Sequence, residues 1–129
     1  MGMRDPEPDI EDLVADYVVS ACLFKAVERD RRYAEHMKLA RVWKQWFERV
    51  SRAAEREYVR CRRGLREAGC RIVLEELTGD RHLHVMYVYR RYEFHSYFVP
   101  FVIKARCEEK LMDLIFGEAR NFDPAGEYK

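Results

Sequence analysis

The chain has few of the residue patterns from which common catalytic sites are built. It contains only six glycines and no glycine-rich loop that could hold a phosphate group. Its three serines, Ser20, Ser51 and Ser96, lie outside any nucleophile-elbow pattern. None of the four cysteines forms a C-x-x-C pair, and each falls in or beside an apolar pattern. We therefore expect reduced, packed cysteines and a non-catalytic protein without a cofactor.

Long apolar runs are also missing. The longest uncharged stretches, Tyr17–Phe24 and Ser96–Ile103, are far too short to cross a bilayer. The acidic beginning of the chain, with two prolines, does not resemble a signal peptide. These absences, together with the reduced cysteines, predict a cytoplasmic protein that has no membrane partner.

The net charge of +1 selects no partner, but the charge is distributed unevenly along the chain. Residues 1–24 carry one basic and six acidic side chains, whereas residues 25–67 carry fourteen basic and seven acidic ones. Residues 68–129 are close to balanced, with nine basic and ten acidic side chains. The positive excess therefore lies on the segment 25–67.

That segment also contains the strongest periodic pattern. Between positions 33 and 68, eleven apolar residues recur at every third or fourth position: Tyr33, Met37, Ala40, Trp43, Phe47, Val50, Ala54, Tyr58, Cys61, Leu65 and Ala68. This spacing predicts one very long helix over about 32–68, with Gly69 as its C-terminal cap.

A helix of that length would span roughly 54 Å, whereas a compact chain of this size has a diameter of roughly 36 Å. Three explanations remain open. The molecule is elongated, the helix breaks near Ser51, or a partner chain covers the protruding part.

A shorter helix is predicted before the long one. Apolar residues at helical spacing from Ile10 to Val27, with Asp9 as the N-cap, indicate a helix over about 9–29. A turn at Arg29–Arg32 would let the two helices pack as an antiparallel hairpin, which buries both apolar stripes.

After Gly69 the apolar spacing changes to two, which predicts strands over 70–77 and 82–89 around a turn at Gly79–Asp80. This register places Cys70 opposite Tyr89, Ile72 opposite Tyr87 and Leu74 opposite Val85 on an apolar face. On the other face it pairs Val73 with Met86, Glu75 with His84 and Leu77 with His82.

Helical spacing returns between Phe94 and Ile115 and ends at Gly117. Pro100 leaves open whether residues 94–99 are extended or belong to the helix. We therefore predict a helix-dominated α+β fold in one domain, residues 1–129. It comprises a helical hairpin with one very long helix (about 32–68), a β-hairpin (about 70–89) and a C-terminal helix from 94 or 100 to 117. Residues 1–8 and 120–129 are expected to be flexible tails.

Three aromatic residues are the first candidate site. Trp43 and Phe47 lie on the main apolar stripe, and Trp46 lies on a second strip that widens it. Tryptophans near the middle of a helix are either core anchors or interface residues, so Trp43, Trp46 and Phe47 form a candidate interface.

Arginines supply the second candidate site. Arg49, Arg52, Arg56 and Arg63 recur along the flank opposite the apolar stripe, where a row of guanidinium groups could follow a phosphate backbone. The alternative is a solvated face with ion pairs within the helix, such as Glu48 with Arg52.

A predicted corner near residue 91 is the third candidate. Arg90, Arg91 and Tyr92 lie within an aromatic-rich run, where they could stack on bases or anchor a protein partner.

The histidines do not predict a metal site. His82 and His84 share a strand face, with His95 further along the chain, but zinc needs three or four ligands that meet at one point. Nothing in the sequence fixes such a meeting point.

These observations favour a small non-catalytic interaction or regulatory module that forms a homodimer through its long helix, with a protein partner as a further possibility. The alternative is a nucleic-acid-binding accessory protein that uses the arginine flank. An enzyme is the third hypothesis, because pairs such as Glu93 and His95 can carry out acid–base chemistry in any protein.

Overall fold

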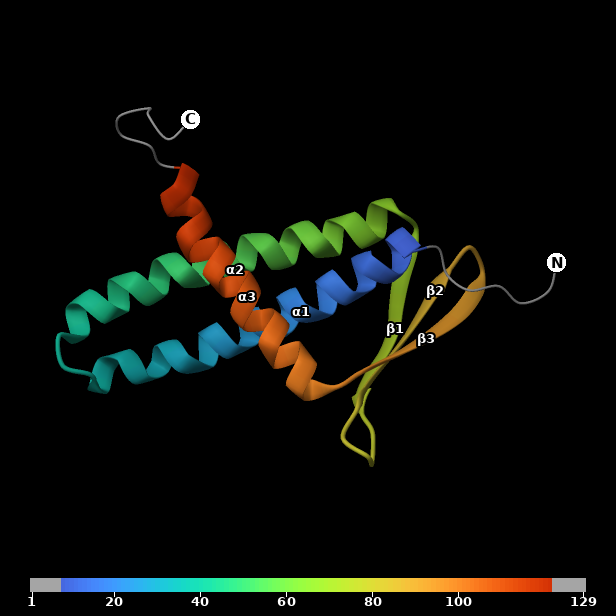
Figure 1. Ribbon diagram of the computed structural model, residues 1–129, viewed down its shortest axis with the longest axis horizontal. Helices are drawn as coiled ribbons and strands as arrows, with labels where there is room; N and C mark the ends of the chain where they lie inside the picture. The colour runs from blue at the N-terminus through green and yellow to red at the C-terminus, as the bar shows by residue number, and fades with distance from the viewer. Residues whose placement is uncertain (1–7, 122–129) are drawn as a thin grey trace.

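The computed structural model describes residues 8–121 and shows a helical hairpin, a three-stranded sheet and a C-terminal helix (Figure 1). The elements are α1 (Pro8–Asp30), the 3₁₀ helix η1 (Arg31–His36), α2 (Ala40–Glu67), β1 (Cys70–Leu77), β2 (Leu83–Tyr89), β3 (Tyr92–Phe98) and α3 (Pro100–Asn121). The predicted helix-dominated α+β fold is therefore confirmed. The expected tails lie mostly outside the described residues, but α3 continues past Gly117, where we expected it to end.

The helices α1 and α2 run side by side, the sheet packs at one end of this hairpin, and α3 crosses the hairpin near its middle (Figure 1). Helix α1 lies at the centre of the main core, where Val14 and Val18 are almost fully buried. They pack with Leu65 of α2, Tyr87 of the sheet and Ile103 of α3. Burial by three neighbours explains why α1 is apolar on several of its sides.

The long helix begins at Ala40, eight residues later than predicted, because the chain turns sharply just before it. Residues 31–36 form η1, Met37 is extended, and Leu39 has a left-handed backbone with φ of 60°. The apolar residues Tyr33 and Met37, although correctly spaced, therefore do not belong to α2.

The 28 residues of α2 are continuous and span about 42 Å. The break considered near Ser51 does not occur. Ser51 is buried and donates its hydroxyl hydrogen to the Glu28 carboxylate of α1, so this polar residue joins the two helices.

The strands form one antiparallel sheet in the order β1-β2-β3. Residues 94–98, for which two conformations were open, belong to strand β3. The expected corner is a two-residue turn in which Arg90 and Arg91 have φ of 54° and 71°, as a type I′ turn requires. Phe94 points into the core and lies 5.6 Å from Tyr87, centroid to centroid.

The register of β1 on β2 is as predicted at the first pairs, Cys70 with Tyr89 and Ile72 with Tyr87, and then shifts by one residue. A β-bulge at Val73 causes the shift, and a longer turn over residues 78–82 accommodates it. The pairs predicted for Val73, Leu74, Glu75 and Leu77 are therefore wrong. Leu74 faces Met86, Glu75 faces Val85, Glu76 faces His84, and Leu77 faces Leu83.

Candidate functional site

The hairpin formed by α1 and α2 extends well past α3 and ends at η1 (Figure 1). This projecting end, which we call the hairpin tip, consists of η1, residues 37–39, the first turns of α2 and the adjacent end of α1. In Figure 1 the sheet lies at the other end of the hairpin and α3 crosses nearer its middle, so the tip projects beyond both.

Trp43, Trp46 and Phe47 lie together at the tip, as the sequence predicted. The ring of Trp46 packs edge-on against both neighbours, with centroid distances of 6.0 Å to Trp43 and 5.0 Å to Phe47. Phe47 is half-buried and packs on the second core cluster around Leu23 and Val27. Trp43 and Trp46 remain 36% and 38% exposed, so Trp43 is no more a core residue than Trp46 is.

The tryptophans belong to a larger exposed apolar surface. Val42, Trp43 and Trp46 follow helical spacing and therefore share one face of α2, and Met37 and Leu39 precede that helix. All five are exposed, with Leu39 reaching 75%. We call these five residues the tip surface. Contiguous exposed apolar residues of this kind usually mark a contact surface.

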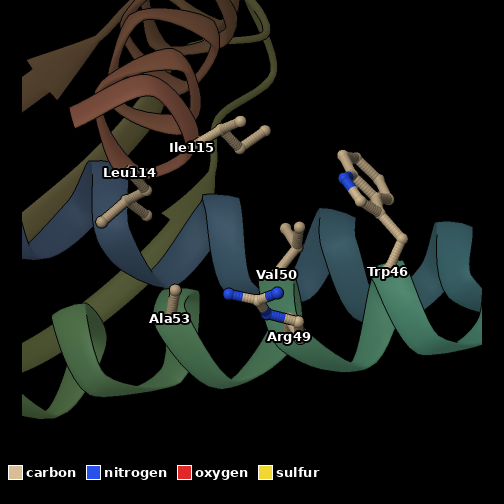
Figure 2. A pocket seen from close by; sticks show the side chains of 6 residues that line it. All are labelled: Trp46, Arg49, Val50, Ala53, Leu114 and Ile115. Carbon is tan, nitrogen blue, oxygen red and sulfur yellow. The ribbon is translucent and has the colours of Figure 1, made fainter. Parts of the chain in front are cut away.

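A hollow of about 190 Å³ lies beside the tip surface, between α2 and α3. Figure 2 shows Leu114 and Ile115 reaching from α3 over α2, with the indole of Trp46 at the opposite edge. Arg49, Val50 and Ala53 of α2 complete the lining. The hollow adjoins Trp46, and it is large enough to take an apolar side chain from another molecule.

The arginine flank is exposed along most of α2. Arg49, Arg52, Arg56 and Arg63 are all solvent-accessible, and Arg52 lies 3.9 Å from the Glu48 carboxylate. Arg52, Arg56 and Arg63 line one shallow groove together with Glu55, Val59 and Arg60. The groove is therefore basic but not free of acidic groups.

The structure does not bring Arg90, Arg91 and Tyr92 near the other candidates. They lie in and beside the β2–β3 turn, at the end of the molecule opposite the hairpin tip (Figure 1). All three side chains are exposed. The predicted sites therefore form three separate surfaces rather than one.

One polar cluster was not identified from the sequence. It joins the three helices and consists of Asp16 and Ser20 of α1, Glu57, Arg60 and Cys61 of α2, and Lys110 of α3. The Lys110 ammonium group donates to Ser20 Oγ at 2.8 Å, to Glu57 Oε2 at 2.9 Å and to the Asp16 carboxylate. In the sequence, the only indication of this cluster is that its polar residues recur at helical spacing within the apolar stripes of their helices.

The charges of this cluster stabilise one another. A hydrogen bond from Arg60, aided by Lys110, lowers the pKa of Glu57 to about 2. Burial alone would raise the pKa of Asp16, but hydrogen bonds from Lys110 and Arg60 outweigh it and lower that pKa. Burial raises the pKa of the Cys61 thiol. The two carboxylates are therefore ionised and the thiol is protonated at neutral pH.

Asp16, Glu57 and Cys61 offer ligand atoms within 4.8 Å of one another, which is close enough to hold a metal ion. The Lys110 ammonium group, however, already lies between the two carboxylates, and Arg60 contacts both of them. The cluster thus has two acidic and two basic groups that pair with each other, and these pairs connect α3 to the hairpin.

Comparison with known proteins identifies one family. A family model described as YhjD protein matches residues 5–119. No curated protein and no solved structure matches the chain. Among the described residues, no helix has both the length and the apolar character needed to span a membrane.

Proposed function

The chain belongs to the YhjD protein family, and we propose that this member is a non-catalytic interaction protein that self-associates through its tip surface. The observation that carries the proposal is the exposure of Trp43 and Trp46 at the end of the hairpin opposite the sheet. Tryptophan is enriched among the residues that dominate binding energy at protein interfaces.

We infer that the partner at this surface is a second copy of the chain. The exposed residues 42, 43 and 46 of α2 follow the spacing by which one helix packs on another. A two-fold axis would place the same surface of a second copy against them, because an isologous contact uses one patch twice. The two hairpins would then form a four-helix arrangement.

The mass of the protein in solution tests this proposal. Light scattering after size exclusion at micromolar concentration is expected to give about twice the chain mass of 15.6 kDa. Trp46→Ala is expected to weaken the dimer about tenfold or more. Its effect should exceed that of Trp43→Ala, because Trp46 contacts both aromatic neighbours and lines the hollow.

Phe101→Ala is the matched control, since Phe101 is 79% exposed but lies on α3 close to the sheet. It should leave the dimer unchanged. A monomer mass at every concentration, or equal weakening by Phe101→Ala and Trp46→Ala, would contradict the proposal.

Nucleic-acid binding is the second candidate function, favoured by the groove that Arg52, Arg56 and Arg63 line on α2. A surface that neutralises about five phosphates of duplex DNA should lose roughly three orders of magnitude in affinity between 50 and 200 mM salt. We expect only weak binding that does not depend on which polyanion is offered. The reason is that Glu48 and Glu55 lie among the arginines and repel phosphate.

Replacing Arg52, Arg56 and Arg63 together by Gln separates the two functions. The helix should remain intact, since Arg and Gln have similar helix propensities. Tight, salt-dependent binding that the triple variant loses would favour the nucleic-acid function over self-association.

A further inference from the structure

Two histidines and two carboxylates form a continuous hydrogen-bonded chain, which we call the histidine chain. It lies on the outer face of the sheet, opposite to the face whose residues Val85 and Tyr87 pack in the core. Glu76 Oε2 lies 3.3 Å from His84 Nδ1, and His84 Nε2 lies 2.8 Å from His95 Nδ1. His95 Nε2 in turn lies 2.7 Å from Glu93 Oε2. The four residues come from all three strands.

The strand register explains why these residues meet. His84 of β2 pairs directly with Glu76 of β1, and this pairing exists only because of the bulge at Val73. On β3, His95 is two residues from Tyr97, the partner of His84, so the two histidines are diagonal neighbours on the same face. Glu93 lies on the same face of β3, two residues before His95.

The orientation of the rings follows from the two carboxylates. Each carboxylate accepts a hydrogen bond from the outer nitrogen of one ring, so His84 Nε2 and His95 Nδ1 are the nitrogens that face each other. The ring planes are 8° apart with centroids separated by 5.0 Å, which is the geometry of an edge-to-edge contact between coplanar rings. With the outer nitrogens directed at the carboxylates, the two inner nitrogens face each other. A metal ion is a species that the lone pairs of two facing imidazole nitrogens can bind together.

We propose that His84 Nε2 and His95 Nδ1 form a binding site for a transition-metal ion of the Zn²⁺ and Ni²⁺ class, with Glu76 and Glu93 orienting the rings. A carboxylate that accepts the second N–H of a metal-binding histidine is the usual outer-shell arrangement in proteins. Water completes the coordination, because the site opens to solvent beside His95.

The change needed to admit the ion is small. Two Zn–N bonds at a tetrahedral angle separate the nitrogens by roughly 3.3 Å, about half an ångström more than the observed 2.8 Å. His84 is held in place, since it is buried and its ring stacks on Tyr97 at a centroid distance of 4.6 Å. The His95 side chain is 39% exposed, so it can tilt until both lone pairs point at one position.

Calorimetric titration of tag-free, chelator-treated protein with Zn²⁺ and with Ni²⁺ tests the site. We expect one ion per chain. His95→Gln should weaken binding at least about tenfold, and Glu93→Ala should weaken it by about ten- to a hundredfold through loss of ring orientation. Far-ultraviolet circular dichroism verifies that each variant is folded.

His82→Gln is the matched control, because His82 lies on the neighbouring turn and pairs with Asp80 rather than with a member of the histidine chain. It should bind either ion as the unaltered protein does. Absence of binding by both ions, undiminished binding by folded His95→Gln, or an equal loss in His82→Gln would overturn the proposal.

Discussion

At the scale of single residues, Lys110 is the member of the three-helix cluster that α3 contributes. Its ammonium group contacts Asp16 and Ser20 of α1 and Glu57 of α2, so one side chain of α3 holds both helices of the hairpin. The Lys110 side chain is only 16% exposed. Burial alone would lower the pKa of Lys110, but its contacts with the two carboxylates raise it. Breaking a pair at such a site leaves charges that are poorly compensated.

We therefore expect Lys110→Met to lower the free energy of unfolding by about 2 kcal/mol. Urea unfolding followed by circular dichroism measures this change. Lys104→Met is the matched control, because Lys104 is exposed on the same helix and should be nearly neutral. Equal stability of the two variants would show that Lys110 does not hold α3.

The acid dependence of stability should change in the same variant. The pKa values of Glu57 and Asp16 are lowered in the folded protein, so the unfolded chain binds protons more readily than the folded one. The stabilisation is therefore complete above about pH 5 and is lost as the pH falls toward about 2. In Lys110→Met this loss should be smaller; an unchanged acid dependence would contradict the origin that we assign to these pKa values.

At the scale of elements, the β2–β3 turn contains an unfavourable local conformation. Arg90 and Arg91 both have positive φ, which costs a side-chain-bearing residue about 1 kcal/mol or more. Arg90 also lies over the Tyr89 ring at 5.1 Å, which offsets part of the cost. Asn-Gly is the sequence that such turns prefer.

Replacing Arg90 by Asn and Arg91 by Gly is therefore expected to raise the free energy of unfolding by about 1 kcal/mol. A thermal melt monitored by circular dichroism measures the gain. Arg71→Gly, in the regular part of β1, is the control and should destabilise the protein instead. A loss of stability in the turn variant would mean that the arginines make contacts that outweigh the strain.

The long periodic patterns predicted the helices and strands well. They did not predict where α2 begins or how β1 pairs with β2, because local backbone geometry determines both. Helical spacing located α1, the body of α2 and α3, since burial on one face selects such spacing. It could not show that Tyr33 and Met37 precede α2, because a turn at Leu39 leaves the spacing unchanged. Likewise, the bulge at Val73 shifts the register without disturbing the apolar alternation before it.

The candidate sites also differ in whether the sequence could predict them. Trp43, Trp46 and Phe47 were predictable because they are close in sequence on one helix. The Lys110 cluster and the histidine chain were not, because each joins residues from three elements whose register and crossing are set by the fold. The partner of His84 was predicted as Glu75 and is Glu76, one position away, owing to the bulge.

At the scale of the whole molecule, the chain has two different ends. The sheet end contains most of the main core together with α1, and α3 crosses the middle of the hairpin (Figure 1). The hairpin tip, which projects beyond the point where α3 crosses, carries exposed apolar residues. We expect association at the tip to leave the sheet end, with its histidine chain and its Arg90–Arg91 turn, accessible.

Tryptophan fluorescence during dilution tests the central proposal most directly. The chain has only two tryptophans, Trp43 and Trp46, and both lie on the tip surface, so their emission reports on this site alone. Self-association through the tip predicts a shift to shorter wavelength as the concentration rises from nanomolar to micromolar, in parallel with a doubling of mass. An emission maximum that stays constant while the mass doubles, or a mass that never doubles, would contradict the proposal.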